Sequence, residues 1–160
     1  RTPDPARALS EIDRLIAMRG DDAFYHELRG QILLESGNAA PAVAAYARAV
    51  ALAPREPLIG AGLGRAQLAA GDPAAARETL EAARARDPRD PRLLRDLGLA
   101  YARTGQNAMA SLVTAERYAL AGRWDDAKLH ATRAAGTLPR GSVGWQRAED
   151  VLAAARDAEE

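Results

Sequence analysis

Residues 30–71 read GQILLESGNAAPAVAAYARAVALAPREPLIGAGLGRAQLAAG, with a glycine at each end. Two series of glycines recur at one fixed step within and beyond this stretch, namely Gly30, Gly64 and Gly98, and Gly37, Gly71 and Gly105. Alanine and proline keep the same step, at Ala42, Ala76 and Ala110, at Ala49 and Ala83, and at Pro54 and Pro88. Several series in one register indicate an internal repeat with a period of about 34 residues, which decides the fold.

Each repeat is expected to hold two antiparallel helices, because this period with small residues at these offsets is typical of tetratricopeptide repeats. Gly30 and its equivalents fall in mid-helix, where glycine costs about 1 kcal/mol against alanine unless a partner helix needs the space. Gly37 and its equivalents fall where a first helix ends and a left-handed residue is favoured. Tyr46 and Leu80 occupy one large apolar position of the repeat.

The repeats are placed at 23–56, 57–90 and 91–124. Asp–Pro pairs predict helix starts at Asp4, Asp72 and Asp90, as N-cap and first helical residue. With the proline and glycine stops, these signals predict about nine helices. The expected ranges are 4–18, 22–36, 39–52, 56–70, 73–86, 90–104, 106–121, 124–137 and 143–157. Period-two alternation is missing, so no strand is predicted and the fold class is all-α, an α–α superhelix of antiparallel helices.

Both ends depart from the regular repeat. Residues 1–21 fit the second half of a preceding repeat, and we expect its first half to lie before Arg1. Gly122 follows Gly105 after only half a period, which predicts an irregular repeat at 108–141 that overlaps the third. The helix at 106–121 then belongs to two repeats. Residues 142–160 are expected to form a capping helix, started by Ser142, and a short acidic tail.

Composition excludes several classes of function. Lysine plus arginine number 22 and aspartate plus glutamate also 22, so the net charge is zero. This balance argues against a general nucleic-acid or membrane-surface binder. No hydrophobic run approaches the ~20 residues that membrane insertion needs. The chain has no cysteine, which removes disulfides and thiolate zinc sites.

The sequence contains only incomplete versions of known catalytic and metal-binding motifs. His26–Glu27 begins like an HExxH zinc motif, but Gly30 stands where the second histidine is needed. The glycine-rich run at 60–64 resembles a phosphate loop, but it lies inside a predicted helix rather than after a strand. The serines stand in no nucleophile pattern. We therefore predict a non-catalytic module with no catalytic residue, metal or cofactor, and place His26 in a packed or half-exposed position between helices.

Binding is expected on the first helices of successive repeats, which line a concave groove in tetratricopeptide-repeat folds. The predicted partner-binding residues are Phe24, Glu27, Gln31, Leu58, Arg65, Leu68, Arg92, Arg95, Leu99 and Arg103. Chaperone-binding members of the family hold a C-terminal carboxylate with a lysine and an asparagine, but Glu27 and Gln31 stand at those two positions, so this clamp is not expected. Arg92, Arg95 and Arg103 suit either a solvated helix face or an arginine-lined groove for an extended or acidic polypeptide.

Three stretches carry a closer resemblance. The sequences at 24–37, 115–123 and 138–145 are similar to the C-terminal tetratricopeptide region of BepA-like (YfgC-like) periplasmic zinc metalloproteases. The resemblance covers Phe24 to Leu152, and the metal ligands of that family have no counterpart in this sequence. It implies a periplasmic module that recruits substrate or assembly-machinery partners for outer-membrane protein quality control. Its implied partners are its own N-terminal protease domain and outer-membrane assembly components.

Two alternatives stay open. One is a stand-alone adaptor without a protease, for which a cytoplasmic location is not excluded. The other is a purely structural or oligomerising segment. The sequence before Arg1 would discriminate between the protease module and the adaptor, because a signal peptide with HExxH supports the protease and further repeats of the same period support the adaptor.

Overall fold

The computed structural model describes residues 4–159, and within that range the chain is all-α. Its nine helices are α1 (Pro5–Met18), α2 (Ala23–Glu35), α3 (Ala39–Leu52), α4 (Pro57–Ala69), α5 (Pro73–Arg86), α6 (Pro91–Arg103), α7 (Asn107–Leu120), α8 (Trp124–Thr137) and α9 (Val143–Glu159). No strand occurs in the described part of the chain. The predicted fold class and the number of helices are confirmed, and most helix bounds agree closely with the predicted ranges.

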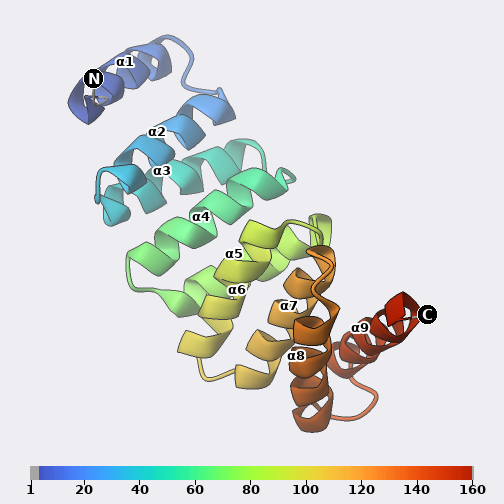
Figure 1. Ribbon diagram of the computed structural model, residues 1–160. Helices are drawn as coiled ribbons and strands as arrows, with labels where there is room; N and C mark the ends of the chain where they lie inside the picture. The colour runs from blue at the N-terminus through green and yellow to red at the C-terminus, as the bar shows by residue number, and fades with distance from the viewer. Residues whose placement is uncertain (1–3, 160) are drawn as a thin grey trace. The chain divides into compact units, whose positions relative to one another are not determined.

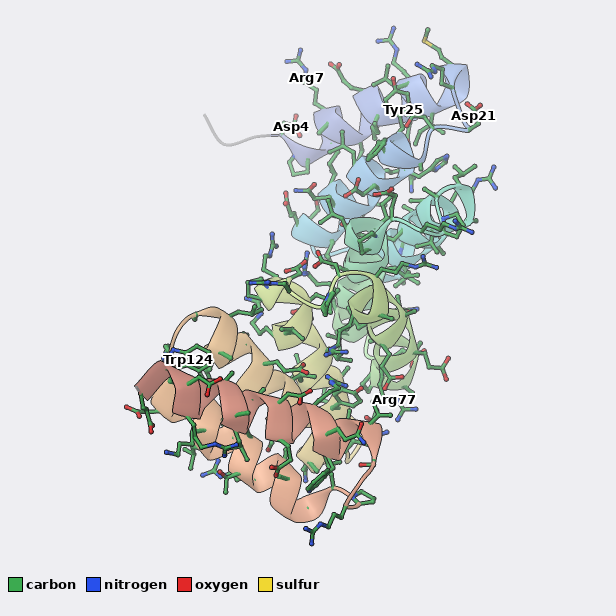
Figure 2. The ribbon with its side chains drawn as sticks, turned by 90° about the vertical axis from the view of Figure 1, so that its right-hand side faces the viewer. Asp4, Arg7, Asp21, Tyr25, Arg77 and Trp124 are labelled. Atoms are coloured by element: carbon green, nitrogen blue, oxygen red, sulfur yellow. The ribbon has the colours of Figure 1, made fainter. Side chains whose placement is uncertain are left out.

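The helices begin and end where the sequence signals predicted. The side chain of Asp90 accepts hydrogen bonds from the backbone amides of Arg92 (2.8 Å) and Leu93 (3.2 Å) at the start of α6. Asp4, labelled in Figure 2 where α1 begins, accepts one from the amide of Ala6 at 3.1 Å. The glycines that end first helices have positive φ, at Gly37 (79°), Gly71 (82°) and Gly105 (76°). Glycine is favoured there because a Cβ is strained in the left-handed region.

The chain divides into two compact units, Arg1–Arg86 and Asp87–Glu160. In the first unit α2 pairs with α3 and α4 with α5, while α1 packs on α2 (Figure 1). The first helices α2 and α4 also contact each other. A core of Leu33, Ala42, Ala45, Tyr46, Leu63 and Ala66 joins these helices. Three of these six residues are alanines, whose small side chains let the backbones approach closely.

Tyr46 fixes the spacing of three helices in this unit. Its ring is 4% exposed and lies between Gly30 of α2 and Gly62 of α4. A Cβ added at Gly30 would lie 2.6 Å from Cδ2 of the ring, and one at Gly62 would lie 2.9 Å from its Cζ. Real Cβ atoms do not approach this closely, so both glycines are required by packing.

The mid-helix glycines do not all act alike. Gly64 meets the side chain of Leu80 too closely to accept a Cβ, as the repeat pattern predicts. At Gly98 an added Cβ would make only an ordinary contact, 3.4 Å from Cγ2 of Val113. The glycine-rich run at 60–64 forms part of the continuous helix α4.

The second unit is built around α7. This helix packs against α6, α8 and α9, while α8 also packs against α9 (Figure 1). Two small clusters fill the space, Leu112, Ala134 and Ala148 in one and Ala115, Ala127, Ala131 and Val151 in the other. Ser142 accepts a hydrogen bond from the amide of Trp145 at the start of α9, as expected for a capping residue. The half-period step is thus accommodated by one helix shared between two antiparallel pairs.

A partly buried ion pair ties α7 to α9. Nε and Nη2 of Arg147 each donate a hydrogen bond of 2.8 Å to the carboxylate of Glu116. The two side chains are 21% and 14% exposed. Such a two-point contact between guanidinium and carboxylate is stronger than a single bond and fixes the relative orientation of the two helices.

Candidate functional site

Two of the predicted partner-binding residues expose large apolar side chains on adjoining helices. Phe24 on α2 is 62% exposed and Leu58 on α4 is 63% exposed. They are separated by one full period, so they hold the same position in successive repeats. The helices that carry them contact each other. Together with Glu27, Gln31 and the half-buried Arg65 they make up what we call the α2/α4 surface.

The polar residues of the α2/α4 surface lie mainly on α2. Partial burial raises the pKa of Glu27 above its ordinary value of 4.5. Gln31 is exposed and donates a hydrogen bond of 2.9 Å from Nε2 to the carboxylate of Glu35. This surface therefore offers apolar contacts beside hydrogen-bonding and acidic groups.

Leu68 differs from the other predicted residues of the first unit. It is 6% exposed, so its side chain packs inside the unit and offers little area to a partner. Leu68 holds a repeat position at which the side chain is expected to face the groove. In the structure the residues packed around α4 cover this side chain instead.

The remaining predicted residues lie on α6, in the second unit. Arg92, Arg95 and Arg103 are exposed and Leu99 is 42% exposed. Arg95 pairs with the buried Asp96 at 3.3 Å. The structure thus gathers the predicted residues into two sets, one on α2 and α4 and the other on α6.

A pocket of about 310 Å³ lies where α6 begins and α7 ends. Its lining residues are Pro91, Arg92, Arg95, Arg117, Tyr118, Leu120, Ala121 and Arg123. Four of them are arginines, and the lining contains no acidic residue. We call this the arginine pocket.

Tyr118 organises the arginine pocket. The guanidinium groups of Arg117 and Arg123 lie over its ring, with Cζ at 4.9 Å and 4.5 Å from the ring centroid. The face of an aromatic ring attracts a cation, and this attraction helps to hold both groups in place. Nε of Arg117 is buried and has no acceptor among the described residues. Arg123 also pairs with Asp126 at 2.6 Å.

His130 lies behind Tyr118, with ring centroids 5.5 Å apart. Burial lowers the pKa of His130 below its ordinary value of 6.5, and the positive charges of Arg133 and Arg117 add to the effect. Asp126 opposes it. The neutral imidazole is therefore favoured beside the arginine pocket.

The other histidine is held by a local contact. Nε2 of His26 donates a hydrogen bond to the carbonyl oxygen of Gly20 at 2.8 Å. The side chain is half-exposed, the second of the two predicted alternatives, and it lines a shallow cavity of about 270 Å³ with Asp13, Arg29 and Arg48. Arg29 donates to Asp13 in the same place at 2.8 Å. Within residues 4–159, no three side chains of the metal-binding types gather around a common point.

The repeat pattern does not predict Arg117, Tyr118 and Arg123 as residues of a site. A signal for them was present, because two antiparallel helices joined by a short loop bring the start of the first beside the end of the second. The pairing of α6 with α7 therefore brings Arg92, at the start of α6, near the basic residues at the end of α7. The repeat pattern predicts partner-binding positions only on the first helices of the repeats.

None of the described helices has the length and apolar character that crossing a bilayer requires. This finding concerns residues 4–159 alone.

Two tetratricopeptide-repeat family models match the chain, one over residues 3–57 and the other over residues 33–98. No curated protein sequence matches it. Several solved structures share its fold. MamA 41-end from Desulfovibrio magneticus RS-1 is 19% identical with a TM-score of 0.71, covering 97% of this chain and 85% of that one.

Two further solved structures resemble this chain at similar levels of sequence identity. TTC0263, a thermophilic TPR protein in Thermus thermophilus, is 22% identical over 93% of this chain and 91% of its own, with a TM-score of 0.59. YrrB, described as a TPR protein with an unusual peptide-binding site, is 18% identical over 97% and 78%, with a TM-score of 0.68. Identities this low establish the fold alone. From its repeats, its paired helices and the two family models, the chain belongs to the tetratricopeptide-repeat family.

Proposed function

We propose that this chain is a non-catalytic module that binds an extended polypeptide through the α2/α4 surface. The observation that carries the proposal is the pair of exposed apolar side chains, Phe24 and Leu58, at equivalent positions of two contacting helices. Large apolar groups exposed next to one another typically serve as anchors for a partner. Glu27 and Gln31 follow Phe24 on α2 at helical spacing and supply hydrogen-bonding groups.

An extended segment is the partner that suits this arrangement. Equivalent positions in successive repeats recur at regular intervals, so they can engage side chains that recur along a peptide. YrrB, which shares the fold, is described as having a peptide-binding site, and that description is in line with the proposal.

The test uses the full chain and a fluorescently labelled, permanently unfolded protein, with binding followed by anisotropy. Phe24→Ala with Leu58→Ala should weaken binding about tenfold or more, since truncating two anchors should remove at least about 1.4 kcal/mol of binding free energy. The matched control is Leu129→Ala with Val143→Ala, which truncates two exposed apolar residues, 49% and 73% exposed, in the other unit. Equal loss in both double variants would show that the α2/α4 surface is not the recognition site.

A finer proposal concerns the cellular role. The resemblance of residues 24–37, 115–123 and 138–145 to BepA-like proteases supports a periplasmic module that recruits substrate or assembly partners for an envelope metalloprotease. The unfolded probe should then be an outer-membrane β-barrel protein, and it should bind more tightly than an unrelated unfolded protein of equal length. No preference between the two probes would favour the stand-alone adaptor, which the fold fits equally well.

A further inference from the structure

The arginine pocket carries an unbalanced positive charge. Arg95 and Arg123 each pair with a carboxylate, Asp96 and Asp126. Arg92 and Arg117 have no carboxylate partner among residues 4–159, although both line the same pocket of about 310 Å³. Two positive charges therefore remain uncompensated at one place in a chain whose net charge is zero. Such a concentration of charge attracts an anion.

The pocket also has features that select the kind of anion. Stacking on Tyr118 positions the guanidinium group of Arg117 without using a carboxylate. A planar guanidinium matches the two oxygens of a carboxylate. Pro91, Leu120 and Ala121 add apolar lining, which suits an anion attached to an amino-acid side chain or a peptide backbone. The volume is at the small end of the range of about 300–1,000 Å³ found for ligand pockets.

We propose that the arginine pocket binds a carboxylate of the partner polypeptide, between Arg92 at the start of α6 and Arg117 at the end of α7. The proposal rests on the proposed function, because it assigns the charge of a segment that the module would bind. The carboxylate has two possible sources, an aspartate or glutamate side chain and the C-terminus of the partner. Both present the same two oxygens to the guanidinium groups.

The test measures binding of three labelled peptides to the full chain at low salt. They are tetraglutamate with an amidated end, tetraalanine with a free carboxyl end, and tetraglutamine with an amidated end as the uncharged reference. The variants are Arg92→Gln, at an exposed position where the change should leave folding intact, and Arg117→Gln. The matched control is Arg156→Gln, which removes the same charge from an exposed position of α9 outside the pocket.

We expect tetraglutamate to bind and tetraglutamine not to bind. Each pocket variant should weaken tetraglutamate binding about tenfold, because one charge-assisted hydrogen bond is lost, and Arg156→Gln should leave it unchanged. Binding of tetraalanine with the same dependence on Arg92 would support the pocket and identify the chain end as the source. Binding should weaken as salt is added, since exposed charges are screened.

Three results would overturn the inference. Equal loss with Arg156→Gln would mean that general charge attraction, not the pocket, holds the peptide. Tighter binding of inorganic phosphate than of tetraglutamate at the same site would assign the pocket to phosphate. Failure of both carboxylate peptides, while the unfolded protein still binds through Phe24 and Leu58, would remove the pocket and leave the proposed function. Failure of the unfolded protein as well would remove both.

Discussion

Adding a methyl group on either side of Tyr46 should disrupt the packing of the first unit. Gly30→Ala places a Cβ 2.6 Å from Cδ2 and 2.8 Å from Cε2 of the ring, and Gly62→Ala places one against the opposite edge. The ring is confined between the two glycines, so it cannot relieve one contact without worsening the other. Overpacking of this kind costs about 1–3 kcal/mol.

Helix propensity partly offsets this cost. Replacing a glycine inside a helix with alanine contributes about 1 kcal/mol in favour of the folded state. The net free energy of unfolding should therefore fall by about 0–2 kcal/mol in Gly30→Ala. In a Tyr46→Ala background the same change meets no ring and should instead raise stability by about 1 kcal/mol. The two changes are then coupled by about 1–3 kcal/mol in a double-mutant cycle, which is the overpacking cost itself.

The assay is urea unfolding followed by far-ultraviolet circular dichroism. Tryptophan fluorescence serves as a second probe, because both tryptophans, Trp124 and Trp145, lie in the second unit and do not report directly on the first. Gly60→Ala is the control within α4, since its Cβ would make only an ordinary contact, 3.4 Å from Cβ of Ala83. The steric reasoning is refuted if Gly30→Ala and Gly60→Ala change stability equally, or if the cycle shows no coupling.

Three further predictions concern the second unit. Gly136→Ala in α8 should raise its stability by about 0.5–1 kcal/mol, because an added Cβ meets nothing within 4 Å; a loss in thermal unfolding followed by tryptophan fluorescence would contradict this. Arg147→Ala should cost about 1–3 kcal/mol by leaving the carboxylate of Glu116 partly buried without this partner, and an unchanged urea midpoint would show that the contact contributes nothing. An NMR titration should place the pKa of His130 below 6.5, because burial and then Arg133 disfavour its charged form. Below pH 6.5 the unfolded state then binds more protons than the folded state. The contribution of His130 to the free energy of unfolding is therefore fully present above pH 6.5 and is lost as the pH falls through the pKa of the folded state. A measured pKa at or above 6.5 would exclude this dependence.

The sequence predicted the helices well because their signals are local. Asp–Pro starts and glycine stops act within one turn of the chain, and the structure places the caps of Asp4, Asp72 and Asp90 where these pairs stand. The close approaches at Gly30 and Gly64 were also predictable, because the repeat marks both positions. Such signals need no knowledge of how distant residues meet.

The features that were missed depend on tertiary contacts. Gly62 has no glycine one period before or after it, since those positions hold Leu28 and Asp96, and only the position of Tyr46 explains its requirement. The arginine pocket combines residues from α6 and from the end of α7, which the repeat frame treats as separate positions. The burial of Leu68 depends on how closely α4 is covered, which the pattern of offsets does not express.

The helix shared by two pairs has a consequence for how this protein can change in evolution or by engineering. A regular repeat array can be lengthened or shortened by whole repeats, because each seam between repeats separates complete pairs. In the second unit α7 contacts α9 as the first helix α2 contacts α4, so α7 serves as the first helix of the pair with α8 while it also pairs with α6. No seam therefore separates the two pairs. Insertions or deletions of one whole repeat should be tolerated before Arg86 and rejected between Pro91 and Thr137. That segment would be inherited as an indivisible block.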